Sequence, residues 1–144
     1  MMIWNDGLAT RNLIIDKEHK ELIEFLNIID ELTPNQKSLT YSLEIIRSLY
    51  RLTAQHFSHE ELLMREFNYN NEQRHLGEYR VMLENFQNLI NDFDRIGIGV
   101  IAAFFEQWLS GHLLREDMPL ARFIQRNQKL AHDAPARPEN RRKS

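Results

Sequence analysis

Cysteine is absent from this chain of 144 residues. Its absence excludes disulfide bonds, zinc–thiolate sites and iron–sulfur clusters, because all of these require cysteine sulfur. No apolar run approaches the length of a membrane-spanning helix, and residues 1–7 lack the basic and apolar regions of a secretory signal. We therefore expect a cytoplasmic protein that does not enter a membrane.

An excess of positive charge is also lacking, since 18 Lys and Arg residues face 21 Asp and Glu residues, for a net charge of −3. This balance gives no general attraction for nucleic acid phosphates or anionic lipids, so we expect neither as a partner. The basic run at 137–143 has nothing apolar to bury, which predicts a disordered basic tail over 131–144. Residues 1–130 fit one domain with an N-terminal arm.

Apolar residues recur every three or four positions in four stretches of the chain, which is the periodicity of amphipathic helices. Asp16 suits the N-cap of the first helix, and Thr33 and Pro34 suit its end. The second helix should break at 68–71, and a turn at 94–99 should follow the third. Because short connections favour antiparallel neighbours, the pattern predicts an all-α fold, an up-down-up-down four-helix bundle.

Residues that can bind a metal ion interrupt the apolar stripe of every predicted helix. In chain order they are His19, then His56 with Glu60, His75 with Tyr79, and His112 with Asp117. Residues four apart lie on one face of a helix, so the two middle pairs each point the same way. In the last pair the two residues are five positions apart, one more than in the middle pairs, which we expect where a helix ends and the chain bends back.

The carboxylates of Glu60 and Asp117 fall on apolar stripes that carry no Lys or Arg. A buried carboxylate is costly unless it is paired or bound to metal, so a pair of metal ions would supply the missing positive charge. Carboxylates can bridge two cations, and imidazoles favour iron over magnesium or calcium. A ferritin-like di-iron bundle needs two Glu-x-x-His motifs, and this chain has only the one from Glu72 to His75.

Together these motifs resemble the hemerythrin family, specifically the single-domain bacteriohemerythrins, over about residues 4–123. The resemblance is carried by Trp4, Gly7, residues 15–22, residues 56–64, Tyr69, His75, residues 108–112 and Asp117. It implies a centre of two non-haem iron ions joined by a bridging oxo or hydroxo group. It also implies that this centre binds dioxygen. By position, one iron would be held by His19 and His56, the bridges would be Glu60 and Asp117, and the second iron would be held by His75 and His112.

Tyr79 departs from the family pattern, which has a third histidine for the second iron at this position. A tyrosine that only packs or hydrogen-bonds would leave that iron one ligand short. Free tyrosine loses its proton near pH 10, but coordination to ferric iron favours the phenolate. An anionic oxygen ligand also stabilises ferric iron, which opposes reversible oxygen binding. We expect Tyr79 to be an iron ligand, with His59 and Glu78 as alternative donors.

Three functions follow from this reading. The first is a dioxygen-binding protein for storage, delivery or sensing. The second is a di-iron redox enzyme that acts on peroxide, oxygen or nitric oxide, with Tyr79 as an iron ligand. The third is an iron-binding regulatory module or interaction bundle that signals through a protein partner, which the sequence does not identify.

Overall fold

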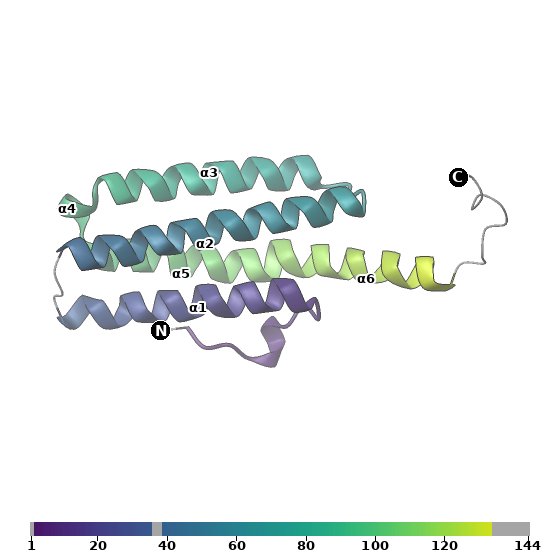
Figure 1. Cartoon of the computed structure of the whole chain (residues 1–144), viewed down its shortest axis with the longest axis horizontal. Helices are drawn as coiled ribbons and strands as arrows, with labels where there is room; N and C mark the ends of the chain where they lie inside the picture. The colour runs from purple at the N-terminus through teal and green to yellow at the C-terminus, as the bar shows by residue number, and fades with distance from the viewer. Residues whose placement is uncertain (1, 36–38, 134–144) are drawn as a thin grey trace.

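The computed structural model describes residues 2–35 and 39–133, and in this part of the chain four long helical segments form an antiparallel bundle (Figure 1). The segments are α1 (Leu13–Asn35), α2 (Leu39–Glu66), α3 (Glu72–Asn91), and α5 (Ile98–His112) continued by the π-helical turn η2 (Leu113–Asp117) and α6 (Met118–Asp133). A short 3-10 helix, η1 (Asp6–Leu8), precedes them, and the single turn α4 (Phe93–Ile96) joins α3 to α5. The predicted all-α, up-down-up-down bundle is confirmed.

The apolar stripes of the four segments meet along the bundle axis. Fully buried members of this core include Leu22, Leu26 and Ile29 of α1, Ile46 and Leu49 of α2, Phe86 of α3, Ile101 and Phe105 of α5, and Leu120 and Ile124 of α6. Within each helix they are spaced three or four residues apart, or a multiple of this, so each helix buries one face. The candidate ligands lie on the same faces, so the bundle places them inside the core.

The start of α1 differs from the prediction that Asp16 is its N-cap. The Asn12 side chain instead accepts a hydrogen bond of 3.0 Å from the backbone N–H of Ile15. Asp16 lies in the first turn, where its carboxylate accepts hydrogen bonds from the backbone N–H (2.9 Å) and hydroxyl (2.7 Å) of Thr10. The cap prediction was therefore wrong, and Asp16 ties the N-terminal arm to α1.

The segment between His112 and Asp117 also differs from the prediction, because the chain does not bend back there. The helix continues through η2, in which the N–H of Met118 bonds to the carbonyl of Leu113, five residues earlier. This π-helical bonding widens the turn, so residues five apart lie on one face. The longer spacing of this pair thus reflects a π-turn inside a continuous helix.

The turn predicted at 94–99 contains the helical turn α4, which ends at Gly97. Gly97 has a φ of 82°, a conformation that other residues rarely adopt, and it sets the direction of α5. At the other end of the chain α6 extends to Asp133, and residues 134–144 of the predicted tail lie outside the described residues. Among the described helices, none combines the length and apolar character needed to cross a membrane.

Candidate metal centre

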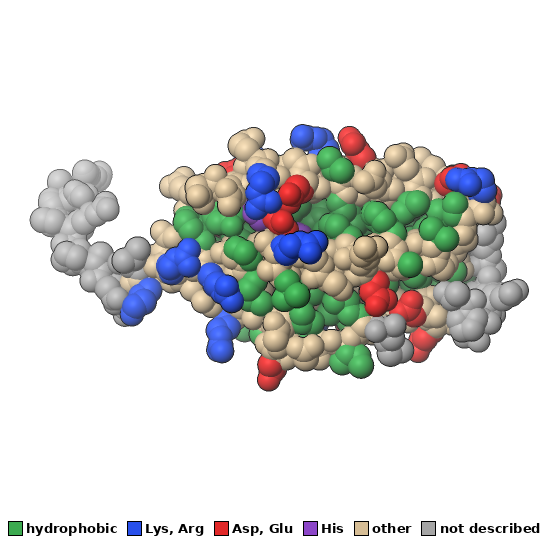
Figure 2. All heavy atoms as spheres, turned by 180° about the vertical axis from the view of Figure 1, so that it is seen from behind, with side chains coloured by type: hydrophobic (Ala, Val, Ile, Leu, Met, Phe, Trp, Pro, Cys, Tyr) green, Lys and Arg blue, Asp and Glu red, His purple; other side chains and the backbone are tan. Residues whose placement is uncertain are grey.

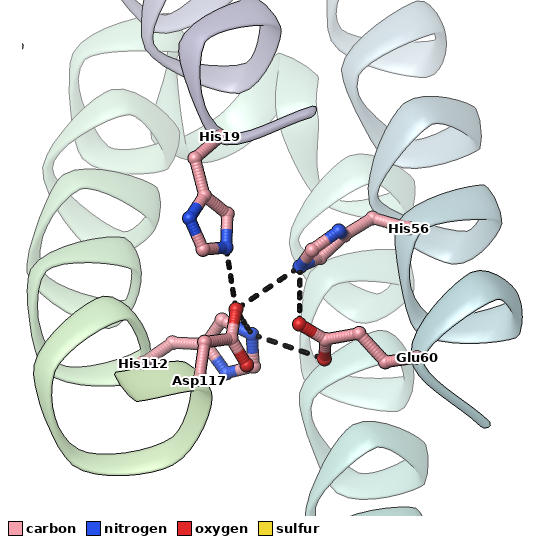
Figure 3. A group of neighbouring side chains, drawn as sticks. All are labelled: His19, His56, Glu60, His112 and Asp117. Carbon is pink, nitrogen blue, oxygen red and sulfur yellow. Dashed lines mark hydrogen bonds and ion pairs between the residues drawn. The ribbon is translucent and has the colours of Figure 1, made fainter. Parts of the chain in front are cut away.

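Five of the seven predicted ligands converge inside the bundle (Figure 3). They are His19 from α1, His56 and Glu60 from α2, His112 from α5 and Asp117 from η2. One potential ligand atom from each residue lies within 4.8 Å of those of all the others. The five residues are at most 4% exposed, so the cluster is enclosed by protein.

One carboxylate oxygen, Oδ2 of Asp117, lies at the centre of this cluster. It is 2.5 Å from Nε2 of His19, 2.8 Å from Nε2 of His112 and 3.2 Å from Nε2 of His56. On the other side, Nε2 of His56 lies 3.0 Å from Oε2 of Glu60. The Nε2 atoms of three histidines thus gather around two carboxylates, which is a donor set suited to a transition-metal cation.

Mutual attraction shifts the pKa values in this cluster. Burial alone would lower the pKa of His112, but the carboxylates of Asp117 and Glu60 outweigh it and raise the pKa to about 9. The pKa of His56 is raised in the same way, against burial, by Glu60, Asp117 and Glu18. Burial would raise the pKa of Asp117, but the neighbouring imidazoles hold it well below its usual range. Without a metal ion, protons on His56 and His112 therefore balance the buried carboxylates.

Several atoms of the cluster are nevertheless left without a hydrogen bond. Within the described part of the chain, Asp117 Oδ1 is buried without a hydrogen-bond partner, and Glu60 Oε2 and His112 Nε2 lie at ion-pair distance from His56 and Asp117 without a well-aligned hydrogen bond. Buried polar atoms are normally paired, and each exception calls for an explanation. A cation bound among these atoms would satisfy all of them at once, so the residues present fit a metal ion.

Glu18, which the sequence analysis did not single out, supports the cluster from α1. Its Oε1 lies 2.8 Å from Nδ1 of His56, and its Oε2 contacts Nδ1 of His59. Burial would raise the pKa of Glu18, but these two histidines outweigh it and lower the pKa. A carboxylate at Nδ1 keeps the proton there and leaves Nε2 free to bind a metal ion.

Tyr79, the position that departs from the family pattern, lies beside the cluster on α3. Its hydroxyl donates a hydrogen bond of 2.5 Å to Oε1 of Glu60, and its ring stacks on Phe57 with 4.1 Å between centroids and 3° between planes. Burial and the nearby carboxylates, Glu60 first among them, raise the pKa of Tyr79, so the phenol is protonated when no cation is bound. Coordination of iron by Tyr79 stays a prediction.

His75 is buried but lies outside the group of five. Its Nδ1 is 3.3 Å from Oε1 of Glu116 and 3.5 Å from the hydroxyl of Tyr79. Burial lowers the pKa of His75, which keeps its imidazole neutral, the form that binds metal ions. Of the alternative donors, His59 contacts Glu18, and Glu78 pairs with Arg74 at 2.9 Å.

A helical bundle with a buried cluster of histidine and carboxylate ligands defines a class of metal-binding proteins. Within this class, residues 12–124 match the model of the Hemerythrin HHE cation binding domain. This match covers most of the chain, which therefore belongs to the hemerythrin family.

Two related proteins agree with this assignment. A Bacteriohemerythrin of Pseudomonas paraeruginosa is 24% identical over 126 residues, which cover 81% of this chain and 76% of the relative. A Bacteriohemerythrin of Stenotrophomonas maltophilia is 23% identical over 131 residues, which cover 84% of this chain and 80% of the relative.

Proposed function

We propose that this chain binds two iron ions and uses them to bind dioxygen for storage, delivery or sensing. The observation that carries the proposal is the group of five buried ligand residues within 4.8 Å of one another. Membership of the hemerythrin family and the name of the bacteriohemerythrin relatives support it. When bound, the two iron ions would supply the electrons and the coordination position that dioxygen needs.

The family pattern implies how the ligands would divide between the two ions. One iron would be held by His19 and His56, the bridges would be Glu60 and Asp117, and the second iron would be held by His75 and His112. Because Asp117 and Glu60 each contact imidazoles from more than one segment, their carboxylates can span two positions. Glu18 would hold the proton on Nδ1 of His56, so that Nε2 faces the ion.

Apolar and aromatic side chains around the ligands would exclude water. Trp108 stacks on His112 with 4.6 Å between ring centroids and 19° between planes, and Phe57 packs against both His56 and His112. Leu113, the first residue of η2, follows His112 in the chain and is fully buried. This enclosure would limit the access of water and protons, a condition for reversible oxygen binding.

An alternative function is a di-iron redox enzyme that acts on peroxide, oxygen or nitric oxide. The observation that favours it is Tyr79, because its hydroxyl lies 2.5 Å from Glu60 and a phenolate formed there would favour ferric iron. A centre held in the ferric state is suited to turnover and not to reversible oxygen binding. Tyr79 is therefore the residue whose role separates the two functions.

The experiment that tests the proposal is an iron count, with visible spectra recorded for the protein as purified, reduced, and re-exposed to air. An oxygen carrier should contain two irons per chain, lose its colour on reduction and regain it with oxygen over repeated cycles. His56→Ala should lower the iron content, whereas His59→Ala should leave two irons per chain. A reduced protein that does not regain its spectrum would rule out reversible binding.

The same samples test the enzyme alternative. A ferric enzyme should show a tyrosinate-to-iron charge-transfer band that oxygen cycling does not change and that Tyr79→Phe removes. It should also consume peroxide steadily, and His56→Ala should abolish this activity. An iron-loaded protein with neither the band nor peroxide turnover would contradict the alternative. A chain that binds no iron at all would favour the interaction bundle considered above.

A further inference from the structure

A surface groove of about 700 Å³ lies between α3 and α5, beside the candidate metal centre. Tyr79 and His112 line it on the side of the cluster, and Met82 and Phe104 line it further along the two helices. Its volume lies in the range of small-molecule sites. On the face seen in Figure 2, histidine atoms are visible between basic and acidic side chains, with hydrophobic side chains beside them.

Two glycines in opposite walls of the groove give it room. Gly77 lies within α3 and Gly111 within α5, although glycine disfavours a helix relative to alanine. A methyl group on Gly111 would overlap the guanidinium of Arg115, at 3.0 Å from its Cζ. On Gly77 it would meet only the guanidinium of Arg80, at 4.0 Å. Each glycine thus has an arginine guanidinium folded back over it.

The two arginines are available to a ligand. Neither Arg80 nor Arg115 forms an ion pair with any residue that the structure describes, whereas Arg74 is held by Glu78 at 2.9 Å and by Glu116 at 3.3 Å. A guanidinium binds a carboxylate through two parallel hydrogen bonds. The groove therefore presents two unpaired cations of the type that recognises carboxylates.

The lining also holds four apolar side chains that suit the body of an organic molecule, among polar ones that include Glu78 and Glu116. Its apolar members are Val81, Met82, Phe104 and Trp108. Val81 is 54% exposed, and Phe104 and Trp108 are partly buried, so a ligand in the groove would cover surface that water now reaches. An inorganic anion would use the arginines but leave this apolar surface in water.

We propose that the groove between α3 and α5 binds a small organic carboxylate with an apolar body, such as an aromatic acid. Its carboxylate pairs with Arg80 or Arg115, and its body packs on Trp108 beside Tyr79. The site needs the folded bundle but not iron, so it goes beyond the proposed function. Because it adjoins Tyr79 and His112, an acid bound there lies next to the second predicted iron position.

Calorimetric titration of the metal-free protein with benzoate tests this proposal, with benzamide as the matched neutral ligand. Benzoate should bind, and benzamide should bind at least about tenfold more weakly because it lacks the charge. Arg80→Gln with Arg115→Gln should weaken benzoate binding at least about tenfold. Arg47→Gln, on an exposed part of α2, should leave it unchanged. Equal binding of the two ligands, or no effect of the double substitution, would overturn the proposal.

Gly77→Leu gives a second test that keeps both arginines. The new side chain would project into the groove, where a Cβ meets nothing within 4 Å except the end of Arg80. Leucine is the better helix former, so circular dichroism should show an intact bundle while benzoate binding is lost. A folded Gly77→Leu protein with full affinity for benzoate would overturn the proposal. Because both tests use metal-free protein, failure to bind iron would not affect them.

Discussion

The hydroxyl of Tyr79 donates a hydrogen bond of 2.5 Å to Glu60, one of the five buried ligand candidates of the metal centre. Tyr79 stands where the resemblance to the family predicts a histidine, and it is hydrogen-bonded to a predicted bridging ligand. While no cation is bound, Tyr79 keeps its proton because burial and nearby carboxylates raise its pKa. Iron can be bound by Tyr79 only if this proton leaves, so the role of the residue can be measured with and without iron.

Tyr79→Phe should destabilise the metal-free protein by about 1–3 kcal/mol. Phenylalanine can keep the stack on Phe57, but Oε1 of Glu60 loses its donor while it remains buried. Urea unfolding followed by circular dichroism would measure the difference. Tyr50→Phe is the matched control, since Tyr50 also packs on a phenylalanine and its hydroxyl makes no hydrogen bond within the described structure. Equal effects of the two substitutions would contradict a specific role for the Tyr79 hydroxyl.

Glu18→Gln should lower the affinity for iron by about tenfold to a hundredfold. The neutral amide replaces the carboxylate that accepts the Nδ1 proton of His56, so the imidazole becomes a weaker ligand. Competition with a chelator of known affinity would measure the change. Glu21→Gln is the control, because Glu21 lies on the same helix and, in the described part of the chain, pairs with exposed Lys17 at 3.5 Å. Unchanged affinity in Glu18→Gln would show that the contact does not tune the site.

The metal-free protein should lose stability as the pH rises from about 6.5 to 9. The folded-state pKa of His112 is raised to about 9, above the value of about 6.5 in an unfolded chain. The folded state therefore holds more protons in this range, and the contribution, at most roughly 3 kcal/mol, is full below pH 6.5 and is lost through pH 9. Urea unfolding at pH 6.5, 8 and 9.5 would measure it, and a flat profile would contradict it.

On the acid side, the same protein should lose stability as the pH falls below about 4. The folded-state pKa of Asp117 is held well below its usual range by His112 and the other imidazoles, although burial acts against them. Its stabilisation is present above the unfolded pKa and is lost as the pH falls through the folded pKa. Asp117→Asn should reduce this loss of stability at low pH. An unchanged loss in that variant would assign it to other groups.

Asp16→Ala should lower the free energy of unfolding by about 1–3 kcal/mol without changing the number of irons bound. Asp16 accepts hydrogen bonds from the backbone and hydroxyl of Thr10, a residue that is only 4% exposed. Its loss would leave the buried N–H of Thr10 without an acceptor. Asp6→Ala, at an exposed carboxylate of the same arm, is the control and should have little effect. A fall in iron content would show that Asp16 also shapes the metal centre.

Local spacing explains which site residues could be predicted from the sequence. Side chains four apart share a helix face, so His56 and Glu60 had to point the same way, and their place on an apolar stripe put them inside. The structure brings both together with His19, His112 and Asp117. Spacing did not reveal the π-turn, because a change of helix type leaves no strong local pattern between His112 and Asp117.

The chain's own sequence thus determined the helical bundle and the inward face of each ligand, since periodicity and burial act within one helix. Tertiary structure alone decided which side chains meet across helices. Glu18 reaches His56 over 38 residues of chain, and Tyr79 reaches Glu60 over 19. These contacts depend on the rotation and axial register of neighbouring helices, which are fixed by packing of the whole core and not by any local pattern.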